Sequence, residues 1–182
     1  TLLLIEKPQS GEILYQGKNI LTLPRRGRKW FRSQVQMISQ NTMGCMNPKM
    51  KIKDIIAEPL ITFQLCKNGN QMKEKVSELL HTVELTDEYG EKYPFQLSGG
   101  QARRVAVARS LAINPKMIVC DEPTSGLDLS IGAKILNFMK QVHDSFDMSY
   151  IWISHNLHEV SYVSDRIIVF YLGCIVESGK TS

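Results

Sequence analysis

Apolar and polar residues follow two different periods along this chain. Three short segments, at 35–39, 117–120 and 150–153, are mainly apolar and too compact for helices, so each predicts a strand. The longer segments between them repeat apolar residues every three or four positions, the spacing of a helix with one buried face. Strands that alternate with helices favour a largely parallel sheet covered on both faces. The pattern therefore predicts an α/β fold.

Six helices are predicted. Two neighbouring helices, at 51–63 and 71–83, lie between the first two strands, and a polar turn at 67–70 connects them. Because helical spacing dominates this stretch, we expect a small helical subdomain inserted into the α/β framework. Ser130 is the expected N-cap of one of the later helices. Further helices are predicted at 25–32, 99–112, 130–146 and 156–163.

Each end of the chain predicts a strand, a turn and a second strand. Residues 11–15 alternate toward a strand, and the turn residues at 16–18 lead back into a short return strand. Near the other end, the predicted strand at 167–171 turns at Leu172-Gly173 into 175–176. The first of these segments predicts a β-hairpin.

Composition excludes several classes of protein. The chain has 182 residues, 43% of them hydrophobic and 22% charged, which excludes disordered, collagen-like and disulfide-rich proteins. The net charge of +4 is mild, and since the one dense basic cluster is at 25–32, we expect no nucleic-acid partner. Four widely spaced cysteines without a CxxC pair favour reduced thiols in a cytosolic protein. The apolar stretch 167–176 is too short to span a membrane.

Two carboxylates follow the strand at 117–120. The carboxyl end of a parallel strand is where open α/β folds bind ligands, and this strand ends in Asp121 and Glu122. Asp121 can hold Mg²⁺ through water, and Glu122 can orient or deprotonate an attacking water. A solvated junction between strand and loop would show the same two residues, so both interpretations stay open on this evidence.

A serine and two glycines open the helix at 99–112. Ser98, Gly99, Gly100 and Gln101 place backbone N–H groups and a hydroxyl at the positive end of the helix dipole. This arrangement suits an anion such as a phosphate. A plain N-cap and turn would also explain it.

The order of the motifs is more specific than any one of them. LSGGQ at 97–101, CDEP at 120–123, SGLD at 125–128 and SH at 154–155 follow one another through alternating helix and strand. In this order the chain resembles the nucleotide-binding domain of ATP-binding-cassette (ABC) proteins. The resemblance implies a P-loop NTPase (RecA-like) fold with an inserted α-helical subdomain, and ATP and Mg²⁺ as cofactors.

The resemblance also implies which residues form the site. Glu122 and His155 would be catalytic, and Asp121 and Gln40 would hold Mg²⁺. ATP would be contacted by Gln40 and, from the facing subunit of a dimer, by the signature and D-loop residues Ser98, Gly99, Gly100, Gln101 and Asp128. Residues 1–40 would be a partial ATPase core with a β-hairpin, 41–105 the helical subdomain, and 106–182 the rest of the core.

Within the ABC proteins, the chain is similar to the ATPase subunits of oligopeptide, dipeptide and related nickel importers. EKPQSGEILYQGKNI, MNPKM and SDRIIVFYLGCIVESG carry this similarity. It implies a second nucleotide-binding domain, a transmembrane permease contacted through 45–50, an extracytoplasmic solute-binding protein reached indirectly, and a place at the cytoplasmic face of the membrane. The sequence departs from the family at Asn156, where an acid is common, at Gly126, and at Ala102-Arg103.

A phosphate-binding loop of the form GxxxxGK[ST] has no match in the 182 residues. The segments 11–18 and 174–181 come near it, but both fail. In ABC proteins this loop precedes a segment like TLLLIEKP, so we expect the chain to start within the helix after it, a helix that Pro8 ends, with the N-terminal strands and the P-loop missing. Without the loop, the chain alone should neither bind nor hydrolyse ATP appreciably.

Other functions stay open. An ABC ATPase of DNA repair would carry a long insertion between Gln40 and Ser98, where this chain has room for two helices only. A translation factor of the family would carry two cassettes. A non-catalytic fragment that only docks to a partner is compatible with the missing loop.

Overall fold

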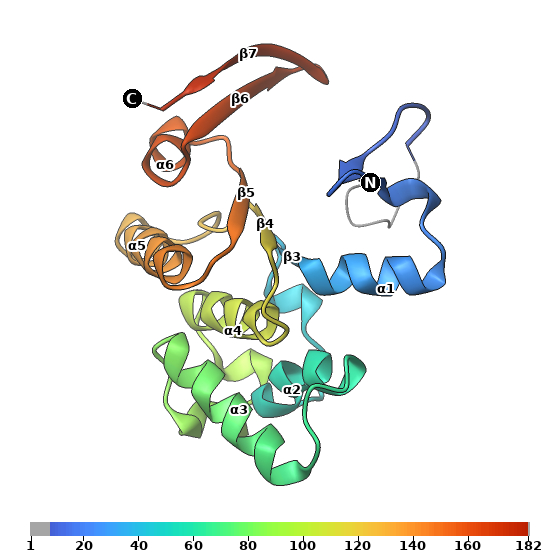
Figure 1. Cartoon of the computed structure of the whole chain (residues 1–182). Helices are drawn as coiled ribbons and strands as arrows, with labels where there is room; N and C mark the ends of the chain where they lie inside the picture. The colour runs from blue at the N-terminus through green and yellow to red at the C-terminus, as the bar shows by residue number, and fades with distance from the viewer. Residues whose placement is uncertain (1–7, 182) are drawn as a thin grey trace.

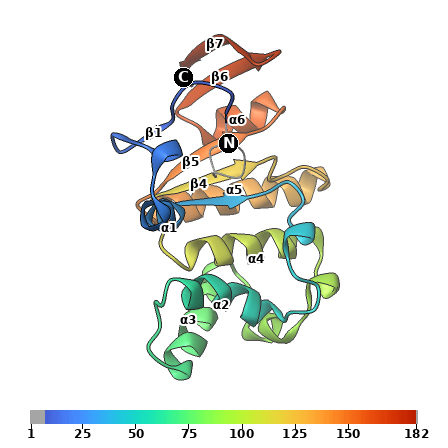
Figure 2. The same ribbon diagram turned by 90° about the vertical axis from the view of Figure 1, so that its right-hand side faces the viewer.

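Three parallel strands form the centre of the molecule. The computed structural model describes residues 8–181, so the predicted helix end before Pro8 lies almost wholly outside the described residues. In these, β3 (Val35–Ile38), β4 (Met117–Asp121) and β5 (Ser149–Ile153) pair in parallel and in chain order. Figure 2 shows the three strands side by side, with α4 and α5 packed along the same side. The predicted α/β fold with a parallel sheet is confirmed.

The helices agree closely with the hydrophobic spacing. The α-helices are α1 (Arg25–Gln34), α2 (Ile52–Thr62), α3 (Gly69–Thr82), α4 (Gly99–Leu111), α5 (Leu129–Ser145) and α6 (Leu157–Val163). Short 3₁₀ helices are η1 (Ile20–Thr22), η2 (Met43–Cys45), η3 (Asp87–Glu91) and η4 (Pro94–Gln96). We call α2, α3 and α4 the helical unit; it lies below the sheet in Figure 1.

Two antiparallel hairpins flank the sheet. β1 (Leu14–Tyr15) pairs with β2 (Lys18–Asn19), and β6 (Arg166–Tyr171) pairs with β7 (Cys174–Lys180). Neither hairpin pairs with the three-stranded sheet in the part of the chain that the structure describes. Figure 1 shows β6 and β7 beyond the end of β5, and the first hairpin beside α1.

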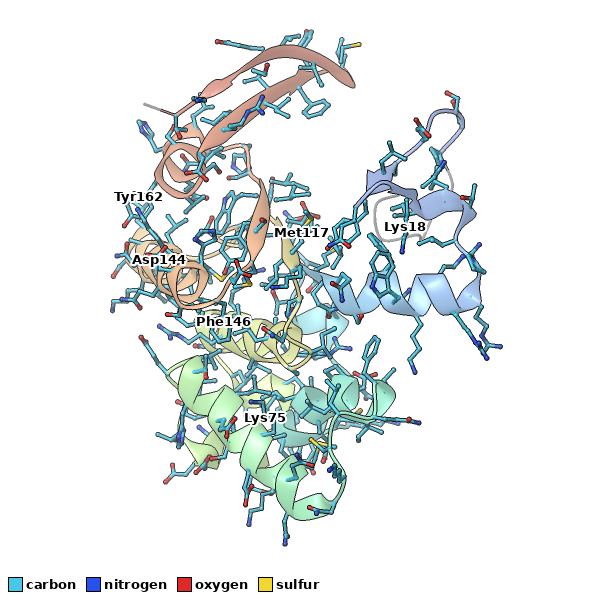
Figure 3. The ribbon with its side chains drawn as sticks, in the orientation of Figure 1. Lys18, Lys75, Met117, Asp144, Phe146 and Tyr162 are labelled. Atoms are coloured by element: carbon cyan, nitrogen blue, oxygen red, sulfur yellow. The ribbon has the colours of Figure 1, made fainter. Side chains whose placement is uncertain are left out.

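The main core joins the helical unit to one face of the sheet. Buried aliphatic residues of α2, α3 and α4 pack in one cluster with α5 and with the inward-facing side chains of the strands, among them Ile118 and Cys120. Phe146, which follows α5, packs against this cluster and lies between α5 and α4 (Figure 3). Because burial raises the pKa of the Cys120 thiol, it stays protonated and serves as a small core residue.

A second, smaller core covers the opposite face of the sheet. Phe31 of α1 packs there with Ile20, Val35 and Val119. This core covers β3 and β4 but does not extend to β5, where Ile151 and Ile153 are exposed in the described part of the molecule. The prediction that helices cover both faces therefore holds for β3 and β4 and is wrong for β5, whose outer face meets no helix among residues 8–181.

One predicted helix boundary is wrong. Asp128, not Ser130, is the N-cap of α5, since its carboxylate accepts a hydrogen bond from the Ile131 N–H at 2.9 Å. Serine and aspartate both cap helices well, so residue type alone could not choose between them. No helix among the described residues is both long and apolar enough to cross a membrane.

Candidate functional site

Glu122 stands just past the end of β4 in an unusual backbone conformation. Its φ is +44°, in the left-handed region that a non-glycine residue adopts at a cost of about 1–3 kcal/mol. The Glu122 N–H still extends the ladder by donating to the Ile153 carbonyl at 2.8 Å. The chain therefore turns sharply at Glu122 while its backbone stays fixed to β5.

Gln40 and His155 meet at the Glu122 carboxylate. Gln40 Nε2 donates to Glu122 Oε2 at 2.7 Å, and His155 Nδ1 lies 2.8 Å from Glu122 Oε1. The three residues follow β3, β4 and β5, so the parallel sheet brings together positions 82 and 33 residues apart along the chain. We call Gln40, Glu122 and His155 the edge cluster. The hydrogen bond from His155 lowers the pKa of Glu122 below its usual value and keeps the carboxylate ionised.

Asp121 lies beside the edge cluster on the last position of β4. Its side chain makes no hydrogen bond or ion pair within the described residues. The same part of the chain holds no group of three or more His, Cys, Asp or Glu side chains arranged to bind a metal ion. Magnesium usually takes only one or two protein carboxylates together with water and phosphate oxygens, and Asp121 suits that mode.

The predicted phosphate turn opens α4. Ser98 Oγ accepts from the Gln101 N–H at 3.3 Å, and Gln101 Oε1 accepts from the Ser98 N–H at 2.9 Å, which forms a capping box. Gln101 Nε2 also donates to the Tyr89 hydroxyl at 2.9 Å. The amide of Gln101 is thus engaged within the chain, whereas Ser98 and Gly99 are exposed.

The two glycines of this turn pack against the segment that contains Asp128. A Cβ on Gly99 would lie 3.0 Å from Leu127, and one on Gly100 would lie 3.1 Å from Ile131. Asp128, the N-cap of α5, lies between Leu127 and Ile131 in the sequence. The structure therefore brings the predicted signature residues beside Asp128, while no hydrogen bond in the described chain joins them to the edge cluster.

Arg103 is a site residue that sequence reasoning missed. It is buried on α4, and its Nη1 donates to the carbonyls of Ser39 at 2.8 Å and Gln40 at 3.3 Å. Burial lowers the pKa of this guanidinium. These two hydrogen bonds hold the backbone of Ser39 and Gln40 against α4, the helix whose N-cap is Ser98. The departure at Ala102-Arg103 was the only signal in the sequence, and it gave no partner.

Glu159 is a second missed residue. It lines a small cavity of about 210 Å³ together with Glu122, Thr124, Ser154 and His155. Its carboxylate accepts hydrogen bonds from Thr124 and Ser154. No pattern in the sequence indicated these contacts.

The family model for the ABC transporter matches residues 1–125. The chain belongs to the ABC transporter family. The motifs that predicted this membership lie along the sheet edge and the start of α4, as described above.

Curated relatives cover nearly the whole chain. It is 41% identical over 179 residues to the oligopeptide transport ATP-binding protein OppF of Lactococcus lactis subsp. lactis, covering 98% of this chain and 56% of that protein. It is 38% identical over 180 residues to the dipeptide transport ATP-binding protein DppF of Haemophilus influenzae, covering 99% and 55%. The chain thus spans about half the length of the curated relatives it matches. The predicted similarity to oligopeptide and dipeptide transport ATPases is confirmed.

Solved structures show the same fold. One is the dimeric post-hydrolysis state of the ATP-binding cassette MJ0796 bound to ADP and Pi, with a TM-score of 0.83 and 27% identity over 100% of this chain and 77% of that one. Another is cbiO1 from Clostridium perfringens, part of the ABC transporter complex cbiONQ, with a TM-score of 0.84 at 24% identity over 99% and 70%. These matches confirm the predicted P-loop NTPase fold.

Proposed function

We propose that this chain forms part of the ATP-hydrolysing subunit of an importer for oligopeptides or dipeptides. The observation that carries the proposal is the edge cluster, in which one carboxylate contacts both Gln40 and His155. The names of the curated relatives support the solute class. The partners would be a second nucleotide-binding domain, a transmembrane permease and, through it, an extracytoplasmic solute-binding protein. The subunit would lie at the cytoplasmic face of the membrane.

The residues of the sheet edge fit Mg²⁺ and the terminal phosphate of ATP. Asp121 would hold Mg²⁺ through water, and the Gln40 side chain offers an amide oxygen to the same ion. His155 faces Glu122 through Nδ1, and its second ring nitrogen, Nε2, would serve the phosphate. When bound, Mg²⁺ neutralises charge on the phosphate oxygens and makes the phosphorus open to attack by water.

Glu122 would act as the general base. Its lowered pKa keeps the carboxylate ionised near neutral pH, so it can accept the proton of an attacking water. Gln40 holds one carboxylate oxygen and His155 the other, which limits the rotation of the side chain. The left-handed backbone at Glu122 adds to this fixed geometry.

The start of α4 would act on ATP bound to the facing subunit. Its exposed Ser98 and Gly99 stand at the positive end of a 13-residue helix. Gly100 would offer its backbone N–H, and Gln101 would hold the Ser98 turn in shape, because its amide is engaged by Ser98 and Tyr89. Asp128, beside this turn, would order the contact between subunits.

A groove between α1 and the helical unit suits the permease. It has a volume of about 1060 Å³. Met46 and Phe63 contribute apolar surface, and Arg25, Arg28 and Arg32 of α1 line one wall. Part of the predicted contact zone at 45–50 lies in this groove. A partly apolar loop of the permease that carries acidic residues would complement it.

The expectation that the chain alone is inactive has a direct test. Three missing charge-assisted hydrogen bonds from a P-loop, at about 1.5 kcal/mol each, would lower the affinity for ATP about 10³-fold. We expect calorimetric titration of the 182-residue chain with ATP and Mg²⁺ to show no micromolar binding. Micromolar binding would contradict this expectation.

Capture of membrane partners tests the transport function. The tagged chain should retain permease subunits from detergent-solubilised membranes of its source. Phe63→Glu, in the groove directly after α2, should abolish the capture, whereas Ile61→Glu, at an exposed position near the end of α2, should leave it intact. Retention of DNA-repair proteins or ribosomes, with no permease, would overturn the proposal in favour of the alternatives.

A further inference from the structure

Glu159 receives hydrogen bonds from two loops that each carry a residue of the edge cluster. Its Oε2 accepts from Thr124 Oγ1 at 2.6 Å and from Ser154 Oγ at 3.3 Å. Thr124 lies two residues after Glu122, and Ser154 lies immediately before His155. One carboxylate on α6 therefore contacts both loops.

We propose that Glu159 is a positioning residue that sets the placement of Glu122 relative to His155. It acts through Thr124 on the Glu122 loop and through Ser154 on the His155 loop. The structural part of this inference concerns the chain alone. Its consequence for turnover rests on the proposed function.

The backbone of Glu122 needs such an anchor. A non-glycine residue at φ +44° persists only where its surroundings hold it in place. On one side Glu122 is fixed by its own N–H, which donates to the Ile153 carbonyl. On the other side the next side-chain anchor is Thr124, which is 9% exposed and donates to Glu159. The Glu122 carbonyl also accepts from the Ser125 N–H at 3.1 Å, so loss of the Thr124 bond would remove the side-chain anchor on this side and leave that backbone bond.

Helix capping explains only part of the geometry. A glutamate at the third position of a helix commonly reaches back to the N-cap residue. Here Glu159 Oε1 accepts from Asn156 Nδ2 at 3.2 Å, and Asn156 is the N-cap of α6. Thr124 lies 35 residues earlier and uses the other oxygen, Oε2. The hydrogen bond from Thr124 is therefore separate from the contact between Glu159 and the N-cap residue Asn156.

The sequence carries a related departure. Asn156 stands where the family resemblance leads one to expect an acid. Asn156 Oδ1 accepts from the N–H of His158, so its role here is to cap α6. The carboxylate that contacts the loops of Glu122 and His155 is that of Glu159.

Hydrogen exchange of the 182-residue chain tests the structural part. Glu159→Ala and Thr124→Val should each speed amide exchange at 122–128 about fivefold, the worth of one hydrogen bond. The double variant should exchange no faster than Glu159→Ala, because both changes break the same bond. Unchanged exchange at 122–128 in Glu159→Ala would overturn the proposal, and so would additive effects.

Two control variants separate this bond from the cap and from general effects of charge. Asn156→Ala removes the cap of α6 and should speed exchange in 157–163 while leaving 122–128 unchanged. Glu74→Ala, an exposed glutamate of α3, should change neither segment. If Asn156→Ala and Glu159→Ala gave the same exchange pattern, capping alone would explain Glu159 and the proposal would fail.

Kinetics of the assembled importer test the consequence for turnover. Glu159→Ala should lower kcat for ATP hydrolysis at least about tenfold and leave KM within about twofold, because the reacting groups are misplaced. Glu159→Gln should restore most of kcat, since its amide can donate to Thr124 and Ser154 and accept from Asn156. A Glu159→Gln protein as slow as Glu159→Ala would overturn the role assigned to these hydrogen bonds. Absence of ATP hydrolysis in the unmodified assembly would instead refute the proposed function, and the exchange result would stand.

Discussion

In the helical unit buried aliphatic side chains pack against one another, whereas at the carboxyl edge of the sheet polar side chains meet across loops. Ile56 and Leu80 are almost completely buried, and each has an apolar environment. Gln40 and His155 are exposed, and hydrogen bonds to Glu122 connect them. The first region thus obtains its stability from burial and the second keeps its geometry through a few directed contacts. Substitutions in the two regions should therefore fail in different ways.

Shortening a buried side chain within the helical unit should have the largest effect on stability. Leu80→Ala removes a side chain that is 2% exposed, which should lower the free energy of unfolding by about 2–5 kcal/mol. Ile61→Ala, at a position of α2 that is 63% exposed, should change it by less than about 0.5 kcal/mol. Urea denaturation followed by circular dichroism measures both. Equal losses of unfolding free energy in the two variants would show that burial of Leu80 does not stabilise the helical unit.

The junction between the two regions should respond to added volume. A methyl group on Gly100 would press on Ile131, so Gly100→Ala should destabilise the chain by about 1 kcal/mol. In an Ile131→Ala background the same change should cost nothing, and a double-mutant cycle in thermal unfolding measures the difference. If Gly100→Ala destabilised the chain equally in both backgrounds, the contact with Ile131 would not be what disfavours a side chain at position 100. Loss of ATP hydrolysis that Ile131→Ala does not restore would assign Gly100 to phosphate binding as well.

The smallest effect concerns pH. Hydrogen bonds from Lys51 and Lys53 lower the pKa of Glu91 from 4.5 to about 2. A lowered pKa in the folded state adds stability above pH 4.5 that is lost as the pH falls through 2. Glu91→Gln should therefore flatten the dependence of unfolding on pH between 4.5 and 2.

Urea denaturation at several pH values checks this prediction. Glu88→Gln, on the same 3₁₀ helix, is the matched control, because Glu88 makes no ion pair among residues 8–181. It should leave the slope between pH 4.5 and 2 unchanged. A slope in Glu91→Gln equal to that of the unmodified chain would show that the two lysines contribute nothing.

The two regions also differ in how far the sequence predicts them. The periods of apolar residues predict the three parallel strands and the helices to within a few positions, because burial of one face imposes that spacing. The same patterns predict Asp121 and Glu122 at the end of a strand. They do not pair Glu122 with His155, and the family resemblance was needed to expect that both serve one site.

Contacts between distant polar residues lay beyond sequence reasoning. Arg103 reaches a carbonyl 64 residues away, and Glu159 reaches a hydroxyl 35 residues away. Such contacts depend on how helices pack on the sheet, which the local pattern does not specify. The cap of α5 was assigned to Ser130 instead of Asp128 for a simpler reason, since two good capping residues lie within one turn of each other.

The direct test of the central claim, that Glu122 is the base of an ATP-hydrolysing site, is the turnover of Glu122→Gln in the assembled importer. Glutamine keeps the shape of the side chain and cannot accept the proton of water, so ATP hydrolysis should fall at least about 100-fold while ATP remains bound. Asp54→Asn, a carboxylate of α2 outside the edge cluster, is the control and should hydrolyse ATP at the unmodified rate. Turnover of Glu122→Gln within about threefold of the unmodified protein would contradict the account.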